Sequence, residues 1–258
     1  MRKKMLFAFL LSMLLCASCS DSPTMKEVFC LENDTVNDQR GRVVHDFDGK
    51  LANDSAFSDG YAFCRQQQLK DSDFYYAVFP ESNYVGLLNG ELVIRLFQHQ
   101  QYIPSDIEAS AKPSVALGKI KKQKFNTVCG GIQVLLKGHG TVTALRFTDN
   151  DTIDRLWGNY VVRRIGEENQ QLLALPSSEG NNEVWLDCAE GVVLSDDTAK
   201  FFTVMLPEGA FYRGFAMDVF GVDSLLYHVA TEKDCKISRG KLLRMPELVI
   251  HPRGNVDL

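Results

Sequence analysis

The stretch that decides the fold runs Phe215-Ala216-Met217-Asp218-Val219-Phe220-Gly221-Val222-Asp223-Ser224-Leu225-Leu226-Tyr227-His228-Val229. On both sides of a glycine-containing turn, large apolar residues occupy alternate positions. Successive side chains of a strand point to opposite faces, so this alternation is typical of a hairpin with one buried face and one outer face. The segment therefore predicts two antiparallel strands.

The rest of the chain repeats this pattern in shorter runs. Apolar, β-branched and aromatic runs are separated by Gly, Asn, Asp and Pro, and no long helical periodicity occurs. The further predicted strands are residues 27–31, 74–79, 91–97, 132–136, 145–148, 160–165, 183–186, 201–206, 236–237 and 242–250. Short helices are predicted near 65–70 and 106–111. Alternating strands with frequent turns favour antiparallel sheets packed as sandwiches, so we expect an all-β chain.

A change of pattern near the middle of the chain predicts two domains. Residues 103–124 contain two prolines, small residues and the run Lys119-Ile120-Lys121-Lys122, without a clear strand pattern. We therefore expect an N-terminal β-sandwich domain at 19–118 and a C-terminal β-sandwich domain at 119–258, following a signal peptide at 1–18.

The first residues have the features of an export signal. Three cations at 2–4 precede an apolar run at 5–15, which is too short to span a bilayer. The following Leu15-Cys16-Ala17-Ser18-Cys19 resembles a lipobox, with Cys16 where leucine is commonest. The resemblance implies that Cys19 carries lipid, including fatty acids such as palmitate, and becomes the first mature residue of an outer-membrane lipoprotein. The alternative is an ordinary signal cleaved after a small residue.

The charge of the chain argues against nucleic-acid partners. Residues 1–18 carry three cations and no acidic residue, so their removal changes the formal net charge from −5 to −8. A chain this acidic has no electrostatic reason to bind nucleic acid. Its short basic segments are interpreted as solvated strand ends or loops.

The cysteines after Cys19 predict buried small side chains. They number five, at 30, 64, 129, 188 and 235, without a Cys-x-x-Cys pair. An odd number at long spacings is neither a disulfide framework nor a zinc signature. Most lie within apolar runs, which is typical of free cysteines in a core.

No motif predicts catalysis, a metal or a cofactor. The five histidines are far apart in the sequence, and neither a Gly-x-Ser-x-Gly elbow nor a phosphate-binding loop occurs. Residues 149–154 place Asp and Asn at alternate positions, as calcium loops do, but lack the glycine and the final glutamate of such loops. A tight turn is the favoured interpretation. We expect that the chain is not an enzyme.

Several segments, taken in order, resemble fimbrillin-like proteins, which are type V pilus subunits and relatives of Bacteroidetes. One is Phe125-Asn126-Thr127-Val128-Cys129-Gly130-Gly131-Ile132-Gln133-Val134. The others are residues 74–80, 111–116, 136–138, 142–147, 156–159, 202–207 and 237–241. The likeness covers roughly Phe74 to Ile250 and depends on the order and spacing of the segments.

The resemblance implies two transthyretin-like β-sandwiches, export as a lipoprotein, and assembly by strand exchange. In the family, an arginine-specific protease cuts the loop after the first strand, and a strand of a neighbouring subunit fills the opened groove. Arg40 and Arg42 close the polar loop that follows the predicted strand at 27–31, so the cut would fall there. The alternative is an uncut, charged surface loop.

The leading hypothesis is thus a fimbrillin-like surface lipoprotein, an anchor, tip or accessory subunit of an adhesive pilus (fimbrium). Its partners would be other pilin subunits, the outer membrane and a ligand on a host or bacterial surface. The first domain is short for the family, and few residues follow Ile250, which predicts a subunit that accepts a strand without donating one or that does not polymerise.

The rival hypothesis is a non-polymerising glycan-binding lipoprotein. Exposed aromatic side chains would serve as sugar platforms, and the candidates are Trp157, Trp185 and Tyr212. The alternation of Trp185 with the polar Glu183 and Asp187 favours burial of the indole.

Overall fold

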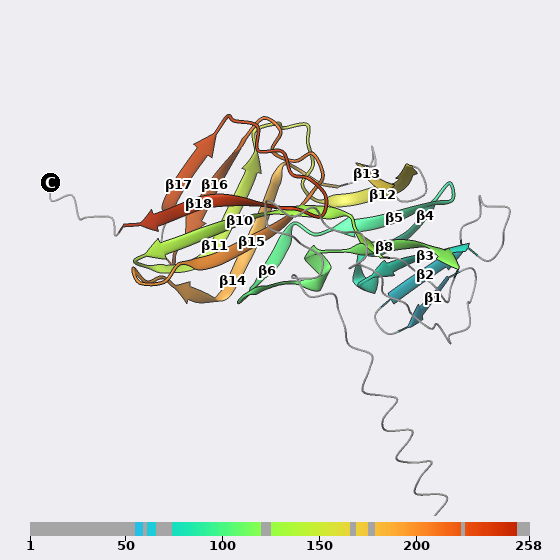
Figure 1. Ribbon diagram of the computed structural model, residues 1–258, viewed down its shortest axis with the longest axis horizontal. Coiled ribbons are helices and arrows are strands. Elements are labelled where there is room, and N and C mark those ends of the chain that lie inside the picture. The colour runs from blue at the N-terminus through green and yellow to red at the C-terminus, as the bar shows by residue number, and fades with distance from the viewer. Residues whose placement is uncertain are drawn as a thin grey trace, which may run out of the picture.

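The computed structural model describes residues 55–58, 61–65, 74–119, 125–165, 169–174, 179–222 and 225–251 (Figure 1). These residues form an all-β architecture, which confirms the predicted fold class. Helical structure within the described ranges is limited to two 3-10 turns, η2 (Glu81–Asn83) and η3 (Ala109–Ala111). None of the helices in this part of the chain has the length and hydrophobicity needed to cross a bilayer.

Two sheets enclose the larger hydrophobic core. The six-stranded sheet has the order β17 (Leu225–Thr231), β16 (Phe215–Phe220), β11 (Thr141–Asp149), β14 (Glu183–Val193), β6 (His99–Ile103) and β7 (Asp106–Ile107). The three-stranded sheet has the order β15 (Lys200–Pro207), β10 (Cys129–Gly138) and β18 (Leu242–Ile250). Phe147, Phe202 and Phe215 lie in their common core.

Two further sheets enclose the second core. The five-stranded sheet has the order β1 (Ser55–Ser58), β2 (Tyr61–Arg65), β3 (Phe74–Phe79), β8 (Ser114–Lys119) and β9 (Asn126–Thr127). The four-stranded sheet has the order β13 (Asn169–Ala174), β12 (Gly158–Ile165), β5 (Glu91–Leu96) and β4 (Tyr84–Leu88). Figure 1 shows the two groups of sheets lying end to end along the longest axis of the molecule.

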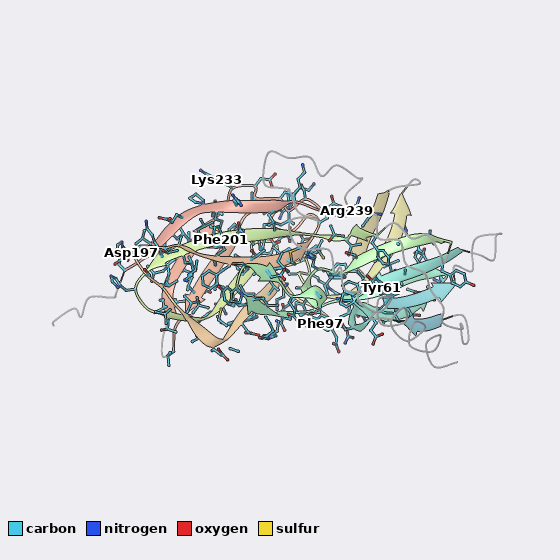
Figure 2. All side chains as sticks on the ribbon, turned by 60° about the horizontal axis from the view of Figure 1, so that its bottom comes forward. Tyr61, Phe97, Asp197, Phe201, Lys233 and Arg239 are labelled. Atoms are coloured by element: carbon cyan, nitrogen blue, oxygen red, sulfur yellow. The ribbon has the colours of Figure 1, made fainter. Side chains whose placement is uncertain are left out.

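Strands cross between the two groups in both directions. After β5 the chain passes Phe97, near the middle of the molecule in Figure 2, and enters the six-stranded sheet as β6, parallel to β14. In return, β12 pairs with β5 in the four-stranded sheet. Residues before and after the predicted domain boundary at 118/119 therefore lie in the same sheets in both groups. The predicted domain limits remain a prediction.

The crossing strand β6 closes one side of the larger sandwich. The buried side-chain amide of Gln100 donates from Nε2 to the carbonyl oxygen of Met205 at 2.7 Å and accepts from the Met205 backbone N–H at 2.9 Å. These bonds satisfy backbone groups of β15 on the side away from β10, where the strand has no neighbour in its own sheet. The six-stranded and three-stranded sheets are therefore joined at this side.

The predicted strands at 74–79 and 242–250 coincide with β3 and β18, and the sequence hairpin is β16 and β17. The turn at Asn89 and Gly90 has φ values of 52° and 79°, as in the tight hairpin turns that favour these residues. The short helix predicted near 106–111 is present only as the 3-10 turn η3, and β7 takes the first two residues of that range. Residues 236–237 lie outside any strand, and the predicted strand at 27–31 lies outside the described residues.

The expectation of buried cysteines is confirmed for three positions. Within the described ranges, Cys64, Cys129 and Cys188 are buried and in no disulfide, and Cys235, also in no disulfide, is half-buried. Burial raises the pKa of the Cys129 and Cys188 thiols to about 12, because a thiolate is poorly solvated in a core. Cys30 lies outside the described residues.

Candidate functional site

The six-stranded sheet has two chemically different faces. On its inner face, alternate residues of the central strands are apolar and fully buried, as are Leu145, Phe147 and Val219. The intervening residues of β11, β14 and β16 point to the outer face, where Arg146 and Trp185 are partly exposed. The outer face is therefore where side chains are available for a function other than folding.

Five outward-facing residues lie in register across five neighbouring strands. His99 pairs with Trp185, Trp185 with Arg146, Arg146 with Asp218, and Asp218 with His228. We call these five residues the cross-strand row. Directly opposed residues on neighbouring strands are close enough for their side chains to interact.

Asp218 fixes one end of the row. One of its carboxylate oxygens, Oδ2, accepts hydrogen bonds from Arg146 Nε at 3.1 Å and Nη2 at 2.6 Å. The other, Oδ1, accepts from Nδ1 of His228 at 2.6 Å. Burial by itself would raise the pKa of Asp218, but the bonds from His228 and Arg146 outweigh it and hold the pKa below its ordinary value. Asp218 is thus a buried, ionised carboxylate on the outer face.

Aromatic rings form the other end of the row. The Trp185 ring lies 6.1 Å from the His99 ring at an interplanar angle of 8°, and 5.3 Å from the Phe220 ring at 24°. The Arg146 guanidinium lies 5.5 Å from the Trp185 centroid and 5.7 Å from that of Phe220, within the range of cation–π attraction. These near-parallel rings are held in place by the guanidinium that Asp218 orients.

Two more carboxylates border the rings. Oδ2 of Asp187 lies 2.8 Å from Nδ1 of His99, and Glu183 approaches the Arg146 guanidinium at 3.8 Å. Asp187 and Glu183 keep side-chain exposures of 32% and 33%, so solvent or a ligand reaches them. The indole N–H of Trp185 has no acceptor among the described residues. The site therefore offers both acceptors and a free donor.

The prediction that Trp185 is buried is wrong. Residues two apart on a strand share a face, so Trp185 lies on the outer face with Glu183 and Asp187, while Val184 and Leu186 enter the core. The polar residues at i−2 and i+2 were in fact a signal for exposure. The sequence contained that signal, but the register that aligns five strands depends on long-range pairing that a sequence pattern does not give.

The other two candidate sugar platforms lie apart from the row. Trp157 is half-buried and donates its indole N–H to Asn181 Oδ1 at 2.9 Å. Tyr212 is 47% exposed, and the Arg213 guanidinium lies 5.4 Å from its ring centroid. The structure thus does not bring the three aromatic candidates together in one site.

The acidic segment at 149–154 forms a turn, as predicted. Asp149 accepts from the backbone N–H of Asp151 at 2.9 Å and from that of Phe211 at 2.7 Å, and Asp151 accepts from Ile153. Burial raises the pKa of Asp149, and the two backbone bonds oppose this shift only in part. No group of His, Cys, Asp or Glu in the described ranges is arranged to hold a metal ion.

The three residues singled out for lipidation and processing, Cys19, Arg40 and Arg42, lie outside the described residues. Lipid attachment and cleavage stay predictions.

No protein-family model matches the chain, and no curated protein matches it significantly. One similar solved structure is that of a candidate cell adhesion protein from Bacteroides ovatus ATCC 8483, at 13% identity and a TM-score of 0.37. The match covers 73% of this chain and 66% of the other, so the chain spans just under two thirds of that protein. At this similarity, the role of the neighbour does not transfer to the chain.

Proposed function

We propose that the chain is a fimbrillin-like surface lipoprotein, an anchor, tip or accessory subunit that joins other pilin subunits by β-strand exchange and takes part in adhesion. Cys19 would tether it to the outer membrane through lipid. The proposal includes no catalytic activity and no cofactor. Its supports are the export signal, the ordered resemblance of residues 74–250 and the all-β fold.

The observation that carries the assembly part is the edge strand β17. It is hydrogen-bonded to β16 on one side and is the last strand in the order of its sheet. Its seven residues, Leu225–Thr231, include no Asp, Glu, Lys, Arg or Pro. Proteins normally protect a free strand edge with charges, prolines or bulges. β17 has a register shift against β16 at Val219/Phe220, close to its start, but it has no acidic residue, lysine, arginine or proline, so the residues after the shift are suited to receive a strand of another chain.

The edge strand β18 provides the contrast. It contains Pro246, which has no backbone N–H to donate to a further strand. Arg244 and Glu247 add charge along the same strand. Such features discourage the addition of a further strand. Of these two edges, β17 is therefore the one proposed for assembly.

Intact-mass analysis of the protein recovered from cells tests this function. A chain that begins at Gly41 or Val43 and co-purifies with pilus material is the expected result, because it shows cleavage after Arg40 or Arg42. A chain that retains lipid on Cys19 and does not associate with pili would argue against polymerisation.

A second candidate is a non-polymerising glycan-binding outer-membrane lipoprotein. The observation that favours it is the partly exposed Trp185 within the cross-strand row. The two candidates share surface display and differ in assembly, so the mass analysis above separates them.

A further inference from the structure

The outer face of the six-stranded sheet has hydrogen-bonding groups that its own contacts leave unused. His99 and His228 each bond a carboxylate through Nδ1 and keep side-chain exposures of 57% and 55%. The second ring nitrogen of each, Nε2, has no partner among the described residues, and neither has the Trp185 indole N–H. These groups lie in one row across the sheet, next to the partly exposed Asp187.

The row is also rigid before any ligand arrives. The Asp218 side chain is only 8% exposed, and it is bonded by both Arg146 and His228, so these three side chains hold one another. Arg146 in turn packs against the rings of Trp185 and Phe220. Side chains that are ordered in advance lose little conformational entropy when a ligand binds.

From this arrangement we infer that the cross-strand row is a binding site for a neutral, hydroxyl-rich glycan chain that lies across the strands. The parts of the Trp185 and Phe220 rings that His99, Arg146 and their own stacking leave exposed supply apolar surface for sugar C–H groups. The indole N–H and the outer imidazole nitrogens exchange hydrogen bonds with hydroxyls, and Asp187 and Glu183 accept from them.

Charge selects a neutral ligand over an anionic one. The one guanidinium of the row is bonded to Asp218 at 2.6 Å and approached by Glu183 at 3.8 Å, and a third carboxylate, of Asp187, bonds His99. A sugar that carries a carboxylate or sulfate would meet like charges and no free cation.

The position of the row also selects a glycan over an extended peptide. A peptide that adds to a sheet bonds to a strand edge through its backbone, whereas the row lies on the face of the sheet. Strands lie about 4.8 Å apart, so a row across five strands extends about 19 Å, the length of an oligosaccharide with several rings. The inference depends on the proposed function only in requiring surface display.

Fluorescence of single-tryptophan variants tests the site, because the chain has only two tryptophans, Trp157 and Trp185. In Trp157→Phe, the remaining indole reports directly from the row. The lipid-free mature chain is titrated with mannohexaose, cellohexaose and laminarihexaose, and with hexagalacturonate as the anionic probe. We expect a saturable change with at least one neutral hexasaccharide and none with hexagalacturonate.

Calorimetry with the neutral sugar that binds completes the test. Trp185→Phe is expected to weaken binding about tenfold, equivalent to about 1.4 kcal/mol, while Trp157→Phe leaves it unchanged. Asp187→Asn keeps the size of the side chain and removes the charge, and it is expected to weaken binding several-fold.

No saturable response of folded Trp157→Phe to any of the three neutral sugars would overturn the inference. So would equal affinity of Trp185→Phe and the wild type, or tighter binding of hexagalacturonate than of the neutral hexasaccharides. Pilus association is measured in a separate experiment, which includes the Asp187→Asn variant. The proposed function fails only if the wild-type chain is absent from the surface or from pili, so its failure is distinguishable from a failure of the glycan site.

Discussion

The inner and outer faces of the six-stranded sheet come from the same strands and differ in what holds them. On the inner face, Phe147 is fully buried and packs against Phe211 and Phe215, with ring centroids 6.3 and 6.0 Å away. On the outer face, Arg146 is partly exposed and held by Asp218. Because side chains alternate along a strand, one face of a sheet can form the core that stabilises the fold, and the other face can carry the residues that recognise a ligand.

The largest expected effect on the free energy of unfolding comes from a substitution on the inner face of the sheet. Phe147→Ala removes a buried ring from the centre of the core, so we expect the free energy of unfolding to fall by about 3–5 kcal/mol. Urea denaturation followed by circular dichroism measures the loss. The matched control is Thr148→Ala, the next residue of β11 on the outer face, for which a change within about 0.5 kcal/mol is expected.

The next effect concerns the outer-face carboxylate. Asp218→Asn removes charge-assisted bonds to Arg146 and His228, so we expect a loss of about 1–3 kcal/mol in the free energy of unfolding at neutral pH. The pKa of Asp218 is lowered in the folded chain, so its stabilisation is present above the unfolded pKa, about 3.9, and is lost as the pH falls through the lower folded pKa. Denaturation at a series of acidic pH values should show a smaller acid loss in the variant than in the wild type.

The inner-face carboxylate should behave in the opposite way. The pKa of Asp149 is raised by burial, so its favourable contribution is present below the unfolded pKa and is lost as the pH rises through the folded pKa. Asp149→Asn should remove this decline with rising pH, as measured in the same denaturation series. Parallel pH profiles for the Asp149 and Asp218 variants would contradict the contrast between the faces.

Fold and site differ in how much of them could be predicted from sequence. Alternation at Phe215, Met217 and Val219 predicted the all-β class because burial of one face repeats every second residue. It could not predict that β6 joins β14 or that β12 joins β5, since strand order depends on contacts between distant segments. The row of His99, Trp185 and Arg146 depends on that strand order. The sequence shows each of these residues, but it does not show that they lie together in one site.

The smallest expected effect on stability tests the strand edge. Ala230→Lys places a charge on the exposed outer side of β17, so the free energy of unfolding should change by less than about 0.5 kcal/mol. Because a charged edge discourages strand addition, recovery of the variant with pilus material in a pull-down should fall. Arg244→Lys on β18 is the matched control and should be recovered like the wild type. Equal recovery of all three would remove β17 as the assembly edge.

Attachment of whole cells tests the central claim most directly, that the inner face maintains the fold and the outer face binds. Cells displaying equal amounts of the wild-type chain, Trp157→Phe or Trp185→Phe are applied to surfaces coated with the neutral hexasaccharide that binds in solution. We predict that the wild-type chain and Trp157→Phe hold cells equally well and that Trp185→Phe loses most of the attachment. Equal attachment by the wild-type chain and both variants would contradict the account.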